Sequence, residues 1–102
     1  MSELRLVDDR LYLGFNWVHL TQQQVRLLIM LVQYKNRIVR ERDLLHALYH
    51  DKDSGRHVND KRQVLRARIY NLRRNIQRVS NIDPRELIES VRGIGYRLNV
   101  PL

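Results

Sequence analysis

The chain has 102 residues, the size of one domain, and 43% of them are hydrophobic, enough for one compact core and too many for a disordered basic tail. It contains no cysteine, which excludes disulfide scaffolds and thiol catalysis, and its longest apolar run, residues 27–32, is too short to cross a bilayer. The formal net charge is +8, and residues 61–78 hold seven basic residues and no acid. A solvated helix would mix the two signs, so this clustering predicts a surface for a polyanion.

The N-terminal third predicts a small antiparallel sheet followed by a helix. Three short apolar runs are typical of strands that need a packing partner: residues 4–7, 11–13 and 17–20. Thr21 and Gln24 have the spacing of a capping box, so we expect a helix over residues 22–33. Its apolar positions at i, i+3, i+4 and i+7 predict one buried stripe: Val25, Leu28, Ile29 and Val32.

A second helix is predicted after a short extended bridge at residues 38–39. It covers residues 41–49, and three of its leucines are expected to be buried: Leu44, Leu45 and Leu48. The next segment, residues 51–59, is rich in Asp, Ser, Gly and Asn and predicts a loop.

The third helix is the clearest element of the sequence. Asp60 is suited to cap its N-terminus, where a carboxylate meets the positive end of the helix dipole. Its apolar residues have spacings of four, three, four and three, which predicts a narrow buried stripe: Leu65, Ile69, Leu72, Ile76 and Val79. The opposite face is basic and polar, so one side of this helix is expected to be core and the other to be free for a ligand.

The C-terminal end predicts a β-hairpin after a loop over residues 80–84. Its strands cover residues 87–91 and 96–100, and the turn between them contains Gly93 and Gly95, which permit positive φ.

Four segments, in this order, resemble motifs of the OmpR/PhoB-type effector domain of bacterial transcriptional regulators. Residues 20–28 resemble LTxxExxLL, with Gln24 in place of the usual Glu, and residues 38–45 resemble V(V/I)SRExLL, with Arg40 in place of the usual Ser. Residues 69–74 are similar to IxxLRxK, and residues 91–98 match VRGxGYxL almost letter for letter. The resemblance covers nearly the whole chain.

The resemblance implies an α+β winged helix-turn-helix with a short N-terminal antiparallel sheet, three helices and a C-terminal hairpin wing. We expect one domain over residues 1–102, with N-terminal strands in 1–20, a three-helix core in 21–79 and the wing in 86–100. By resemblance, the protein is a cytoplasmic bacterial regulator of the response-regulator type, associated with the nucleoid when it is bound to DNA. The resemblance further implies that it binds double-stranded DNA in a sequence-specific way, as a homodimer on direct repeats, with its third helix in the major groove and its wing in the minor groove.

The candidate contact residues follow from the helix faces and from this resemblance. The positions opposite the apolar stripe are expected to read base edges: Arg66, Ala67, Tyr70, Asn71 and Arg74. Another set is expected to contact phosphates: Thr21, Gln22, Tyr49, Arg62, Arg68, Arg73, Arg78 and Tyr96. Packing within the protein is the alternative for Tyr49 and Tyr96. Arg92, at the hairpin tip, is placed by resemblance in the minor groove, where the potential of a narrow groove attracts a cation.

Two further interpretations remain open from the sequence. By resemblance, the loop after the second helix contacts RNA polymerase, with Asp51 and Asp53 as candidates, and a plain connector is the alternative. The whole domain is alternatively a module that docks on RNA polymerase or another regulator, or a nonspecific nucleic-acid binder. No enzyme activity, cofactor or metal site is expected, because no nucleophile–base set, phosphate loop or closed ligand set is present.

Overall fold

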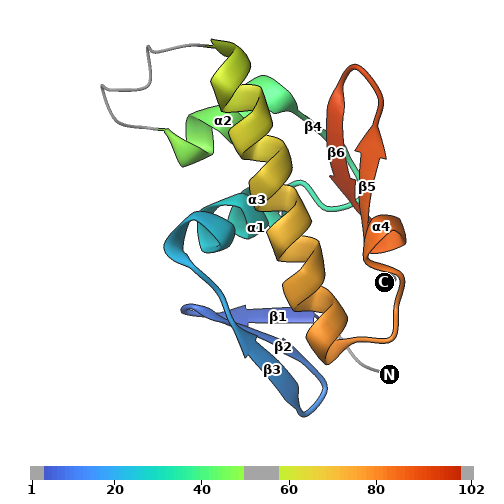
Figure 1. The fold of residues 1–102 in the computed structure, drawn as a ribbon. Helices are drawn as coiled ribbons and strands as arrows, with labels where there is room; N and C mark the ends of the chain where they lie inside the picture. Colours follow the sequence, from blue (N-terminus) through green and yellow to red (C-terminus); the bar gives the residue numbers. More distant parts are fainter. Residues whose placement is uncertain (1–3, 50–57, 100–102) are drawn as a thin grey trace.

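The computed structural model describes residues 4–49 and 58–99, and Figure 1 shows how their helices and strands are arranged. In chain order the elements are β1 (Leu4–Val7), β2 (Arg10–Leu13), β3 (Asn16–His19), α1 (Gln22–Gln33), β4 (Ile38–Arg40), α2 (Glu41–Leu48), α3 (Val58–Val79), α4 (Pro84–Leu87), β5 (Ile88–Val91) and β6 (Gly95–Leu98). The long helix α3 runs through the middle of the molecule, with the N-terminal sheet at one end and the hairpin of β5 and β6 beside it (Figure 1). This is the expected α+β winged helix-turn-helix.

The N-terminal sheet is antiparallel, in the order β1-β2-β3. Leu11 pairs with Val18 across β2 and β3, and both side chains are buried. Strand residues alternate between the two faces, so the neighbouring residues Tyr12 and Trp17 lie on the outer face, where Trp17 is exposed. One face of this sheet therefore contributes to the core, as the sequence predicts.

Helix α1 begins as predicted, but it presents a different face to the core. Thr21 and Gln24 form the capping box, in which the backbone nitrogen of Gln24 donates to the Thr21 hydroxyl over 3.2 Å. The buried residues are Gln24, Leu27, Leu28 and Leu31, whereas Ile29 and Val32 are 51% and 42% exposed. The predicted stripe was wrong for Ile29 and Val32. The four buried residues have the same i, i+3, i+4, i+7 spacing as the predicted stripe, but their first member is the polar Gln24, so the apolar pattern did not indicate them. The side-chain oxygen of Gln24 accepts hydrogen bonds from the Thr21 backbone and from Asn75, which makes its burial tolerable.

Helices α2 and α3 confirm the predicted order, with two differences at the level of single residues. Leu44 and Leu48 of α2 are buried, whereas Leu45 is only partly buried. Helix α3 begins at Val58, so Asp60 lies within its first turn and does not precede the helix as its cap. An acidic residue in the first turn has the same favourable relation to the helix dipole as one at the cap, so composition alone does not fix the starting residue.

The wing is a three-stranded antiparallel sheet in the order β4-β6-β5, which the bridge at residues 38–39 completes. Gly93, in the turn, has a φ of +79°, whereas Gly95 is required for a different reason. A Cβ on Gly95 would lie 2.0 Å from the carbonyl oxygen of Val39, because β4 passes directly beside it. Gly95 therefore permits the pairing of β4 with β6.

The short helix α4 was not predicted from the sequence, which indicated loop up to residue 84. Asp83 caps it by accepting a 2.9 Å hydrogen bond from the backbone nitrogen of Arg85, and Pro84 occupies its first position. Because α4 ends at Leu87, the strand that follows begins at Ile88.

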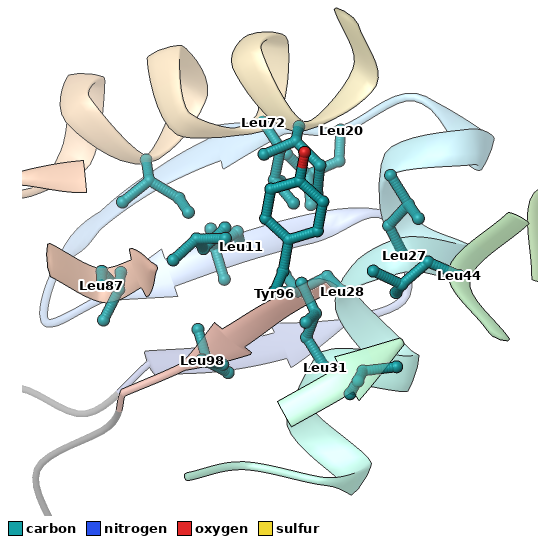
Figure 2. Packing of buried hydrophobic residues seen from close by; sticks show 14 of the residues in the cluster. Leu11, Leu20, Leu27, Leu28, Leu31, Leu44, Leu72, Leu87, Tyr96 and Leu98 are labelled. Carbon is teal, nitrogen blue, oxygen red and sulfur yellow. The ribbon is translucent and has the colours of Figure 1, made fainter. Parts of the chain in front are cut away.

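One hydrophobic core joins these elements. Every residue of the predicted α3 stripe, from Leu65 to Val79, is at most 6% exposed. Figure 2 shows Leu72 of α3 together with leucines of β2 and α1, and the ring of Tyr96 from the wing lies among them. The core thus holds α3 by one side only, which fixes the direction in which its other side faces.

Candidate DNA interface

The side of α3 opposite the core carries a continuous set of exposed side chains. All five candidates for base contact are exposed: Arg66, Ala67, Tyr70, Asn71 and Arg74. Tyr70 is 57% exposed, although it is a large aromatic residue, and the guanidinium carbon of Arg74 lies 5.9 Å from the centroid of its ring. The structure therefore brings these candidates together on one outward face.

The other basic residues of α3 divide into two groups. Arg62 and Arg78 are exposed, whereas Arg68 is partly buried and its Nε donates to the side chain of Gln23 on α1. The ammonium of Lys61 lies 5.6 Å from the ring centroid of Tyr49. Some of the positive charge in this helix is thus directed to neighbouring elements of the protein.

Arg73 is the strongest example of a charge held within the protein. Its Nε and Nη2 both donate to the carbonyl oxygen of Ile88, over 3.1 and 2.5 Å, and Nη2 also donates to the hydroxyl of Ser90 over 2.9 Å. Burial lowers the pKa of Arg73, and nearby charges modify it to a smaller extent. An arginine nevertheless stays protonated in proteins, so this is a charged fork bound to strand β5.

The candidates at the helix ends have mixed environments. Thr21 and Gln22 are exposed at the start of α1, and the Thr21 hydroxyl is used as the cap. Tyr49 follows α2 and is only partly buried, with its ring packed against the core. Both interpretations of Tyr49, as a core aromatic and as a contact residue, therefore fit its position. Asp51 and Asp53, the candidates for polymerase contact, lie outside the described residues.

The wing tip and α3 line an open cleft with a volume of about 340 Å³. Arg66 and Arg73 line it from α3, Arg92 lines it from the hairpin turn, and Glu41 lines it from the start of α2. Arg92 is exposed. The cleft therefore holds three guanidinium groups and one carboxylate, a predominantly positive environment.

Tyr96 forms part of the inner wall of this cleft and is only 7% exposed. Burial raises the pKa of its hydroxyl, Glu41 raises it further, and Arg73 and Arg66 act in the opposite direction. Its ring belongs to the hydrophobic core. The structure thus shows the packing that the sequence had left as one of two alternatives for Tyr96, which also lines the cleft.

Sequence reasoning missed two features of this site. It did not identify Glu41, whose backbone nitrogen donates to the carbonyl oxygen of Ile94 over 3.1 Å and so joins α2 to the wing turn. It also did not identify the hydrogen bonds from Arg73 to β5, because a sequence does not show which arginine a neighbouring strand will bind. Among residues 4–49 and 58–99, no cluster of three His, Asp or Glu side chains suited to a metal is present.

A helix-turn-helix whose outward third helix adjoins a basic hairpin defines the class of winged-helix DNA-binding domains. The family model described as "Transcriptional regulatory protein, C terminal" matches residues 16–98. The chain belongs to this family, the OmpR/PhoB-type C-terminal DNA-binding domains of transcriptional regulators.

Solved structures show the same fold. The C-terminal domain of the lantibiotic response regulator NsrR, the nisin resistance regulator, is 24% identical with a TM-score of 0.75, and the match covers 98% of this chain and 95% of that one. The DNA-binding domain of the response regulator AdeR, in complex with an intercistronic region, is 16% identical with a TM-score of 0.76, covering 99% and 98%. EmbR of Mycobacterium tuberculosis, in complex with a low-affinity phosphopeptide, is 26% identical with a TM-score of 0.78, covering 98% of this chain and 25% of that one.

No curated protein matches this chain. In the part of the chain that the structure describes, no helix has the length and apolar character needed to cross a membrane.

Proposed function

We propose that this domain is a sequence-specific binder of double-stranded DNA that regulates transcription, with α3 in the major groove and the wing in the minor groove. The observation that carries this proposal is the joint placement of Arg66 on α3 and Arg92 on the wing around one cleft. A helix fits the major groove, and a cation on a hairpin tip suits a narrow minor groove. The phosphate backbone that separates the two grooves would then pass along the positive cleft between them.

Base reading is assigned to the outward face of α3. Arg66 and Arg74 offer a fork that matches the two acceptors of guanine, and Asn71 offers the donor and acceptor that match adenine. Ala67 suits the methyl group of thymine, and Tyr70 lies between these positions, exposed and beside Arg74.

Phosphate contact is assigned to groups at the edges of this face. Arg62 and Arg78 are exposed along α3, and Arg68 is partly buried with its Nε donating to Gln23. Thr21 and Gln22 lie at the N-terminus of α1, where free backbone N–H groups attract an anion. Tyr49 completes the set at the end of α2.

Two finer parts of the proposal rest on the family resemblance. The resemblance implies that members often bind direct repeats as tandem dimers, and we propose the same arrangement for this domain. The segment that contains Asp51 and Asp53 is proposed to contact RNA polymerase. The DNA-binding domain of AdeR, which has a similar fold, is in complex with an intercistronic region in its solved structure.

The test is selection of binding sites from a library of random-sequence DNA duplexes, at a low and a moderate salt concentration. The proposal expects a defined motif that persists at the higher salt, and repetition of the motif would support tandem binding. An Arg66→Ala and Asn71→Ala double variant is the matched control, because it removes base-reading groups from an exposed face and leaves the core intact.

The other outcomes distinguish the competing functions. Binding that falls steeply with salt and yields no motif would indicate a nonspecific nucleic-acid binder, because phosphate contacts alone carry no sequence information. Absence of binding at both salt concentrations would favour the module that docks on a protein. Either result would overturn sequence-specific recognition by this domain.

A further inference from the structure

We propose that Arg73 is a positioning residue that holds the wing at a fixed place relative to α3, and so couples contacts in the two grooves of DNA. This inference rests on the proposed function, because it assumes that both α3 and the wing bind DNA. It replaces the phosphate contact that the sequence suggests for Arg73. Three hydrogen bonds from its guanidinium to Ile88 and Ser90 carry the inference.

The strands of the wing are connected to the rest of the fold in different ways. Strand β6 lies in the middle of the sheet, where β4 pairs with it on one side and β5 on the other. The backbone of Glu41 also donates to Ile94 in the turn. The β6 side of the wing is therefore fixed to α2 and β4, whereas β5 is an edge strand.

Arg73 supplies the polar connection on the β5 side. Among the described residues, no backbone hydrogen bond joins α3 to β5 or β6. The guanidinium of Arg73 reaches from α3 to the carbonyl oxygen of Ile88 and to the hydroxyl of Ser90, two residues further along β5. Because both bonds come from one rigid planar group, they fix the direction of the strand as well as its distance from α3.

The surroundings of Arg73 make this connection selective for arginine. Its guanidinium carbon lies 5.9 Å from the ring centroid of Tyr96, which faces Ser90 across the hairpin in the paired register. The fork thus binds one strand of the wing and lies near an aromatic ring of the other. A side chain with a single donor would keep only some of the hydrogen bonds to Ile88 and Ser90.

The consequence for DNA binding concerns Arg92. Val91 pairs with Gly95 at the end of the hairpin, and Arg92 begins the turn directly beyond this pair. A change in the direction of β5 therefore moves Arg92 relative to Arg66 on α3. Arg73 would act on the minor-groove contact through the strand that it holds.

The first experiment needs no DNA. Backbone ¹⁵N relaxation of the whole chain is compared between the wild type, Arg73→Gln and Ser90→Ala, with thermal melting to confirm that each variant is folded. We expect order parameters in residues 92–95 to fall in Arg73→Gln, and to fall less in Ser90→Ala, while those of α1 stay unchanged. Unchanged order parameters in the turn of a folded Arg73→Gln variant would overturn the inference.

The second experiment is a double-mutant cycle on the duplex obtained by selection. Arg92→Ala and Arg73→Gln are each expected to weaken binding by about tenfold, and the double variant by no more than the stronger single variant. The matched control pairs Arg92→Ala with Arg62→Gln, which removes the same charge from the same helix, and its two effects are expected to multiply.

Salt dependence separates a positioning role from a phosphate contact. In the Arg92→Ala background, Arg73→Gln is expected to leave the slope of log K against log salt unchanged, whereas Arg62→Gln lowers it by about 0.9. A further drop of about 0.9 for Arg73→Gln would assign Arg73 to phosphate and overturn the inference. If selection returns no motif while the wing loosens in the free variant, the proposed function fails and the structural connection through Arg73 stands.

Discussion

The outward face of α3 and its flank toward the wing both carry arginine, but their surroundings differ. Arg66 and Arg74 project from the outward face and are exposed, whereas Arg73, on the flank, donates its hydrogen bonds to β5. Counting the basic residues of a helix therefore overestimates the number of groups that are available to a polyanion. Seven basic residues lie in residues 61–78, yet Arg68 and Arg73 also bind neighbouring parts of the protein.

The largest effect on stability is expected from a substitution in the hydrophobic core beneath α3. Leu72→Ala deletes a side chain that is 0% exposed beneath α3, and we expect it to lower the free energy of unfolding by about 2–5 kcal/mol. Urea denaturation followed by circular dichroism measures this change. A loss no larger than that of an exposed substitution such as Gln77→Ala would show that α3 is not held by this stripe.

The next largest effect on stability is expected from a substitution in the wing, where β4 pairs with β6. Gly95→Ala places a Cβ 2.0 Å from the Val39 carbonyl oxygen, so β4 and β6 must move apart, and we expect a loss of about 1–3 kcal/mol. Gly93→Asn is the control, because no atom lies within 4 Å of its Cβ position and Asn tolerates positive φ. Equal stability of the two variants, by thermal melting, would contradict the close approach of β4 to Gly95.

A substitution on the outward face should affect DNA binding and leave the fold intact. Arg66→Ala removes an exposed side chain, and we expect a loss of about 1–3 kcal/mol of binding free energy with relaxed preference at one base position. Fluorescence anisotropy on the selected duplex and on single-base variants of it measures both quantities. A uniform loss on every sequence would identify Arg66 as a phosphate contact.

A smaller effect is expected at the edge of the same face. Arg62→Gln should lower the salt slope of binding by about 0.9 without changing sequence preference. Lys35→Gln makes the same charge change at an exposed position after α1 and should leave the slope as it is. Equal slopes for the two variants would place Arg62 away from the DNA backbone.

The smallest expected effect is a pH dependence within the hairpin. Hydrogen bonds from Asn99 and then Arg97 lower the pKa of Glu89, with the Arg97 Nη2 lying 2.7 Å from its Oε1. A depressed pKa in the folded state gives stability that is present above the unfolded value and is lost as the pH falls below about 4.5. Thermal melting between about pH 3 and pH 6 should therefore show a slightly weaker acid dependence in Glu89→Gln. An unchanged dependence would show that this pair does not contribute to the pH response.

The sequence predicted the parts of the fold that depend on local patterns. The capping box at Thr21 and the narrow stripe of α3 were sufficient, because their residue types allow one arrangement only. The face of α1 was not determined, since two sets with the same spacing compete and the burial of Gln24 depends on Asn75, 51 positions away. Helix α4 carried a local signal in Asp83 and Pro84 that was taken for a loop.

The residues of the site were also predictable only where they depend on a local pattern. The outward residues of α3 follow from its stripe, because a helix buried on one side must expose the other. The bond between Arg73 and β5 joins residues 15 positions apart through a fold that the local pattern does not specify. Long-range side-chain contacts of this kind decide which charges remain available, and they require the structure.

Chemical-shift mapping with the selected DNA duplex shows which surface of the domain binds DNA. We expect large changes at Arg66, Tyr70, Asn71 and Arg74 and at the wing tip around Arg92. We expect none at Ile29 and Val32, which are exposed on α1. Changes centred on α1 or on the N-terminal sheet, with α3 and the wing unaffected, would contradict this expectation.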